Sequence, residues 1–105
     1  MNLFRKKNKI LITIDSSDCE DPAKLKGLLG EFTSLKDNEI RITVNSLPMN
    51  ASFQILEILL SFSLHIRNQG AHAVWFISKQ WAEFLQSLGC IDLLGDWQIK
   101  ELSNG

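Results

Sequence analysis

Five stretches of the chain carry the apolar pattern of β-strands. Residues 9–14 are β-branched and almost continuously apolar, which is typical of a strand covered on both faces. Residues 39–45 alternate apolar and polar with a period of two, as in a strand with one buried face. Residues 72–77 predict a further buried strand. Residues 3–5 predict a short first strand and residues 97–102 a final edge strand.

Apolar residues at three- and four-residue steps predict helices between these strands. Asp21 followed by Pro22 is typical of a helix start, and an apolar stripe then runs from Leu25 to Leu35. Ser78 predicts the start of a later helix, which Gly89 ends. Residues 91–94 form one more apolar turn.

The longest predicted helix covers residues 51–69, and Gly70 is a natural C-terminal cap for it. Its polar residues fall on one narrow stripe at helical spacing: Gln54, Glu57, Ser61, His65 and Asn68. Residues 55–66 are the longest apolar segment, but polar residues interrupt it and it is well short of the roughly 20 apolar residues of a membrane span. We therefore predict a helix that packs in the core.

Strands and helices alternate through most of the chain, and this order predicts the α/β class with a single domain over residues 1–105. We expect a mixed, mainly parallel sheet of about four to five strands packed with three to four helices. Residues 1–8 would form the short first strand or a basic tail, and residues 103–105 a frayed tail.

Composition agrees with one ordinary globular domain, with 45% hydrophobic and 22% charged residues. Eleven basic residues face twelve acidic ones, for a net charge of −1. Four of the basic residues lie within the first nine positions, which leaves the rest of the chain with a charge of −5. The overall charge gives no reason to expect binding to nucleic acid or to an anionic membrane, and no segment favours direct membrane insertion. A basic run this short beside a strand is typical of a solvated edge or turn, so we assign it no function.

Few residues favour catalysis or metal binding. Cys19 and Cys90 are far apart and the two histidines have no partner at metal-ligand spacing, so we expect no metal, no cofactor and a reducing, cytoplasmic setting. The acidic loop at residues 15–21 has oxygen ligands but lacks the glycine and the final glutamate of an EF-hand. An enzyme that uses this loop with a divalent ion is one alternative. Otherwise no residue is expected to be catalytic.

Several segments together resemble a STAS domain, the family of anti-sigma-factor antagonists, stressosome scaffold proteins and related transporter modules. The segments are the strand at residues 40–44 with Leu47 and Met49 after it, the helix from Ser52 that ends at residues 66–70, the strand to Ile77, and residues 85–94. The resemblance covers about residues 9–102. It implies the STAS-like α/β fold.

The family also implies a phosphorylation site. Phosphorylatable members carry Asp-Ser-Ser-Gly or Asp-Ser-Gly-Gly where this chain has Asn50-Ala51-Ser52-Phe53, and counting back from Gly70 aligns Ser52 with the phosphorylated serine. Ser52 lies in the first turn of the predicted helix, where free backbone N–H groups and the helix dipole stabilise a phosphate. A docking patch would surround it, formed by Leu47, Pro48, Met49, Asn50, Ser52, Phe53 and Gln54.

By resemblance, the chain would be a non-catalytic protein-binding module that acts as an anti-sigma-factor antagonist. Its partner would be an anti-sigma factor with serine kinase activity, and Ser52 would be the switch. The alternative is an unphosphorylated scaffold, either stressosome-like or the small cytoplasmic subunit that braces the ATPase of a lipid-transport ABC system. Ala51 in place of an acidic residue and the bulky Phe53 favour this alternative. A weak homodimer is compatible with both.

A purely structural interpretation of the same residues also stands. Asn50 or Ser52 would then cap the helix, and Phe53 would pack into the core.

Overall fold

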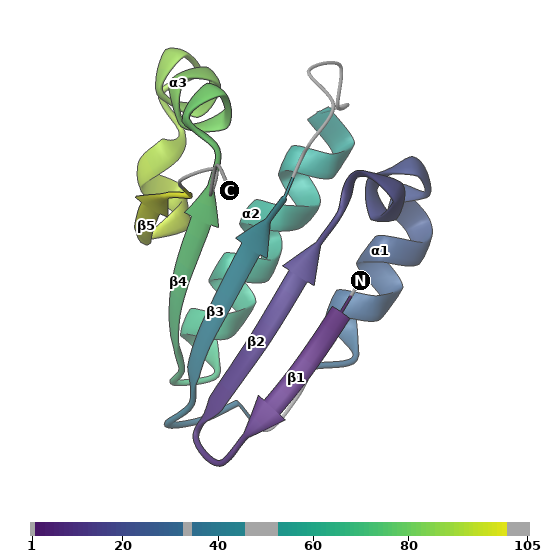
Figure 1. Cartoon of the computed structure of the whole chain (residues 1–105), viewed down its shortest axis with the longest axis vertical. Helices are drawn as coiled ribbons and strands as arrows, with labels where there is room; N and C mark the ends of the chain where they lie inside the picture. Colours follow the sequence, from purple (N-terminus) through teal and green to yellow (C-terminus); the bar gives the residue numbers. More distant parts are fainter. Residues whose placement is uncertain (1, 33–34, 46–52, 101–105) are drawn as a thin grey trace, which may run out of the picture.

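The structure is a computed structural model that describes residues 2–32, 35–45 and 53–100 of the 105. Within these residues it contains a five-stranded sheet, three α-helices and two short 3-10 helices (Figure 1). In chain order the elements are β1 (Asn2–Lys6), β2 (Lys9–Ile14), η1 (Ser16–Glu20), α1 (Pro22–Gly30), β3 (Glu39–Val44), α2 (Phe53–Asn68), β4 (His72–Ile77), α3 (Lys79–Ser87), η2 (Ile91–Leu94) and β5 (Asp96–Ile99). The predictions for residues 46–52 and 101–105 lie outside the described residues.

The five strands lie side by side in chain order, β1-β2-β3-β4-β5. β1 is antiparallel to β2, whereas the β2–β3, β3–β4 and β4–β5 pairs are parallel. The α/β class is therefore confirmed, with a mixed sheet. Residues 2–6 form a strand, so the alternative of a basic tail is wrong for them.

The helices α1 and α2 both lie behind the sheet (Figure 1). Each parallel connection moves one strand further in the same direction, and connections of one hand then place their helices on one face. Burial follows this arrangement in β2: Ile10, Ile12 and Ile14 are at most 1% exposed, while Leu11 is 39% exposed. The prediction of a strand covered on both faces is therefore wrong for β2.

The same one-sided cover explains β4, which was predicted to be buried throughout. Trp75 and Ile77 are buried on the helix side, but Val74 and Phe76 on the other side are only half-buried. A continuous run of apolar residues here marks a strand in the middle of a sheet and does not require a second layer of helices.

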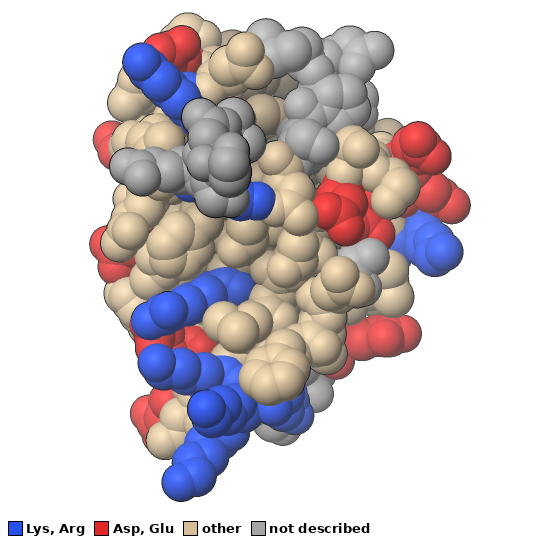
Figure 2. Space-filling view, viewed as in Figure 1, with Lys and Arg blue, Asp and Glu red and all other residues tan. Residues whose placement is uncertain are grey.

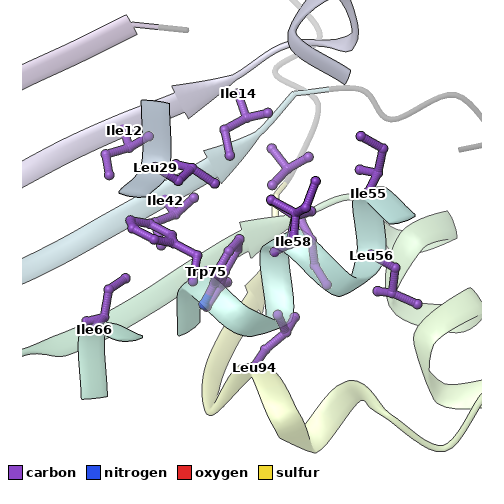
Figure 3. Packing of buried hydrophobic residues seen from close by; sticks show 14 of the residues in the cluster. Ile12, Ile14, Leu29, Ile42, Ile55, Leu56, Ile58, Ile66, Trp75 and Leu94 are labelled. Carbon is purple, nitrogen blue, oxygen red and sulfur yellow. The ribbon is translucent and has the colours of Figure 1, made fainter. Parts of the chain in front are cut away.

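The hydrophobic core fills the space between the sheet and α1 and α2 (Figure 3). Trp75 is fully buried and Trp81 is 6% exposed, which confirms that both fill the core. Trp97 is partly buried and packs against it. The labelled side chains in Figure 3 come from every layer of this packing: Ile12, Ile14, Ile42 and Trp75 from the sheet, Leu29 from α1, Ile55, Leu56, Ile58 and Ile66 from α2, and Leu94 from η2.

The helix ends carry the predicted capping groups. Asp21 Oδ1 accepts a hydrogen bond from the Lys24 backbone N–H at 3.1 Å, and Ser78 Oγ accepts one from the Trp81 N–H at 3.2 Å. Gly70, with φ of 77°, follows α2 as predicted. By contrast, α1 ends at Gly30 and is shorter than the apolar stripe that predicted it. Phe32 and Leu35, the last residues of that stripe, are buried although they lie beyond the end of the helix.

The longest helix, α2, has 16 residues. In the part of the chain that the structure describes, no helix is long and apolar enough to cross a membrane.

Gly27 offers a simple test of α1. It lies inside the helix with no atom within 4 Å of where a Cβ would be, so Gly27→Ala removes backbone entropy from the unfolded chain without a clash. We expect urea denaturation to show a free energy of unfolding higher by about 0.5–1 kcal/mol. Gly70→Ala is the control, and its positive φ should instead cost about 1–2 kcal/mol. A destabilised Gly27→Ala protein would contradict the assignment of α1.

Candidate functional site

The helix α2 has three different faces. Its inner face is buried against the sheet through Ile55, Leu59 and Ile66, all at most 2% exposed. Its outer face forms a polar ridge of the exposed residues Gln54, Glu57 and Ser61, as the sequence predicts. The third face is apolar but exposed, and it makes α2 a candidate binding element.

This third face forms a groove of about 480 Å³, here called the α2 groove. Its apolar lining comes from Phe53, Leu56, Leu60 and Leu64 of α2 and Leu93 of η2. Phe53 is 72% exposed, Leu93 58% and Leu64 54%. Arg67 also lines the groove, and the 14 residue steps from Phe53 to Arg67 correspond to about 21 Å along the helix axis.

The far wall of the α2 groove is held by a buried hydrogen bond. Ser63 Oγ donates to the Leu94 carbonyl oxygen at 2.9 Å, and both residues are 3% exposed. Ser63 is the one buried polar residue of the described core, and this bond satisfies its hydroxyl. Because Ile91 and Leu94 are buried in the same short 3-10 helix, Leu93 between them is left to line the groove.

A second groove of about 480 Å³ lies on the other side of the ridge, between α1 and α2. Glu57 and Ser61 line both grooves, so the outer face of α2 stands between two depressions. His65 lies in this second groove, where its Nε2 donates to the Phe32 carbonyl oxygen at 2.8 Å. His65 therefore joins α2 to the chain just after α1.

Two of the predicted docking residues, Phe53 and Gln54, lie in the described structure. Both are exposed in the first turn of α2, with Phe53 in the α2 groove and Gln54 in the second groove. The interpretation in which Phe53 packs into the core is therefore wrong. Leu47, Pro48, Met49, Asn50 and Ser52 lie outside the described residues.

A polar chain crosses the carboxyl ends of the strands, and the sequence interpretation missed it. Asn45 Nδ2 donates to Asp15 Oδ1 at 2.8 Å, and Lys100 Nζ donates to Asn45 Oδ1. Asp15 follows β2, Asn45 follows β3 and Lys100 follows β5, so the chain ties three strands at one edge of the sheet. Polar residues directly after parallel strands are the signal that could have indicated it.

The acidic loop after β2 forms a helix start. The Asp15 N–H donates to Asp18 Oδ2 at 2.8 Å, and the Asp18 N–H donates to the Asp15 carbonyl at 3.0 Å. Among the described residues, which include this whole loop, no group of three His, Cys, Asp or Glu side chains is placed to hold a metal ion. The Asp18 carboxylate thus caps the start of η1, whereas the Asp15 carboxylate accepts the hydrogen bond from Asn45.

Two further titratable residues lie away from the grooves. Burial raises the pKa of the Cys19 thiol to about 11, and the charge of Asp18 adds to this rise, so the thiol stays protonated near neutral pH. His72 begins β4 as predicted, and its Nε2 lies 2.9 Å from Asp96 Oδ2 of β5 in an exposed pair. The His72–Asp96 contact therefore joins two neighbouring strands of the sheet.

Neither a protein-family model nor a curated protein sequence matches this chain. The α2 groove and the residues around it are therefore the basis for a functional conclusion. Their chemistry is apolar, with one acidic and one basic side chain in the lining, which suits contact with another protein.

Asp18 makes the stability of the acidic loop depend on pH. Partial burial acts to raise the pKa of Asp18, but the hydrogen bond from Asp15 and nearby positive charge, including Lys24, lower it below its ordinary value of 3.8. Its stabilising contribution is present above pH 3.8 and lost as the pH falls through the lower pKa of the folded state. Thermal unfolding of wild type and Asp18→Asn should therefore differ at pH 7, with wild type more stable, and converge in acid. A difference that stayed constant down to strongly acidic pH would contradict this.

Proposed function

We propose that this chain is a non-catalytic protein-binding module whose partner docks on the α2 groove. The observation that supports this most strongly is the exposure of Phe53, a large aromatic residue that is 72% exposed at the first turn of the longest helix. Aromatic residues of this kind contribute strongly to protein–protein binding when a partner buries them. Leu64 and Leu93 extend the same apolar surface.

The partner that fits the resemblance is an anti-sigma factor with serine kinase activity. Ser52 directly precedes Phe53 in the sequence, so a phosphate on Ser52 would add negative charge next to the apolar end of the α2 groove. Transferring that charge out of water on docking costs free energy, and phosphorylation would therefore release the partner.

A second candidate in the same binding class is a scaffold subunit that braces an ATPase without phosphorylation. The observation that favours it is the sequence Asn50-Ala51-Ser52-Phe53, which lacks the acidic residue of phosphorylatable STAS domains. In this function the α2 groove would be occupied permanently, and Ser52 would serve only the start of the helix.

The decisive experiment is affinity capture from native lysate with matched baits, followed by titration of the recovered partner. Phe53→Ser should weaken binding at least about tenfold, equivalent to about 1.4 kcal/mol, because it removes the exposed aromatic anchor. Leu88→Ser is the matched control, since Leu88 is 43% exposed at the end of α3 and does not line the groove. Equal binding by wild type and Phe53→Ser would refute the α2 groove as the docking site.

Charge substitution at Ser52 separates the two candidates. If the chain is a kinase-regulated antagonist, Ser52→Glu should lose a histidine-kinase-like ATPase that wild type and Ser52→Ala both retain. If it is a scaffold, all three baits should bind the same ATPase or scaffold subunit equally well.

A further inference from the structure

The open face of the sheet carries a small apolar spot near the β1–β2 hairpin. Phe4 of β1 is 59% exposed and Leu11 of β2 is 39% exposed. The two residues are cross-strand partners in the antiparallel pair, so their side chains are neighbours on one face. Alternation along β2 places Leu11 opposite the buried Ile10 and Ile12, on the side away from α1 and α2.

Cations border this spot on two sides. Lys6 and Lys9 form the next cross-strand pair on the same face, two residues from Phe4 and Leu11 toward the hairpin turn. On the other side, Arg41 of β3 is the partner of Leu11. All three are exposed. Lys7 is exposed in the hairpin turn itself, and Figure 2 shows Lys and Arg side chains gathered at this end of the open face.

The nearby negative charge does not balance these cations. Glu39 lies 3.9 Å from Lys9 Nζ and 3.4 Å from Arg41 Nε, so one carboxylate is shared between two cations in exposed pairs. Such pairs are weak and leave most of the positive field intact. The remainder of the chain is acidic, which makes the molecule strongly polarised toward this end.

We propose that this hairpin face binds the surface of an anionic lipid bilayer. Phe4 and Leu11 would enter the headgroup region while Lys6, Lys9 and Arg41 contact lipid phosphates. Three observations favour a bilayer over other anionic partners. The face is part of an open sheet, one of its two exposed apolar residues is a leucine that cannot stack on a nucleobase, and its net positive charge opposes pairing with the same face of a second copy.

Membrane binding in this orientation is independent of the proposed function. α2 lies on the opposite side of the sheet from Phe4 and Leu11, so a bound bilayer would leave the α2 groove open to its partner. Either surface can therefore fail its test without affecting the other.

Co-sedimentation with vesicles tests the proposal directly. The full chain should sediment with vesicles of phosphatidylcholine and phosphatidylglycerol in equal parts, but not with phosphatidylcholine alone, and added salt should weaken the binding. Lys6→Gln with Lys9→Gln should lower the partition coefficient about fivefold for each cation removed. Phe4→Ser should lower it at least about fivefold, and Phe4→Leu should restore most of the loss.

Matched controls lie on the helix side of the molecule. Lys26→Gln with Lys79→Gln removes two exposed cations from α1 and α3, and Phe53→Ser removes an exposed aromatic residue from α2. Both variants should bind anionic vesicles as wild type does. Circular dichroism and cooperative unfolding should show that the Phe4 and lysine variants remain folded, as expected for exposed positions.

Three outcomes would overturn the proposal: equal binding to both kinds of vesicle, no binding to anionic vesicles at low salt, or wild-type binding by the Lys6 and Lys9 double variant. Binding of oligodeoxythymidine that Phe4→Ser abolishes, with no vesicle binding, would instead assign this face to single-stranded nucleic acid and would also overturn the proposal.

Discussion

The structure depends on the order in which its parallel strands are added to the sheet. From β2 to β5, every strand is added next to the previous one on the same side, without a reversal. Connections of one hand then put α1 and α2 on a single face, and the sheet buries only every second residue there. Open α/β sheets usually bind ligands where the strand order reverses, and the five described strands have no such point. Surfaces, more than a central crevice, are therefore what the fold offers to partners.

Because helices cover the sheet on one side only, α2 has both buried and exposed faces. One face is buried on the central strands, and the faces that have no neighbouring element are exposed. The Ser63 to Leu94 hydrogen bond draws η2 against it, and the His65 to Phe32 bond ties it to the end of α1. Both contacts use polar side-chain atoms of α2 to bond backbone carbonyls at or just beyond the end of another helix, where carbonyls lack partners within that helix. The first contact holds η2, whose Leu93 lines the α2 groove, and the second contact is made by His65, which lines the second groove.

Much of the fold was predictable because local signals are strong in this chain. The bounds of β2 and β4, the caps Asp21 and Ser78, and the stop after α2 all follow from short stretches of sequence. The sequence of β2 alone could not predict whether helices cover one face of the sheet or both, because a run of apolar residues is compatible with either. The position of Phe53 was likewise ambiguous, since helical spacing does not say which of two apolar stripes meets the sheet. The polar chain from Asp15 to Lys100 joins residues far apart in sequence, and only the strand order brings them together.

Many of the exposed apolar residues fall into two groups, and these groups form the two surfaces proposed to bind partners. Of the eight large apolar side chains exposed among the described residues, Phe4 and Leu11 lie on the open face of the β1–β2 hairpin and three lie in the α2 groove. A scatter of single residues would need no explanation, but such grouping typically marks contact surfaces. The charges around the two groups differ: the hairpin group is bordered mainly by cations, whereas the groove has one Glu and one Arg. A single partner suited to both surfaces would need an anionic end for the hairpin and an apolar end for the groove, and it would have to reach around the sheet. Two separate partners on opposite faces require neither, and this is the simpler consequence of a sheet covered on one side.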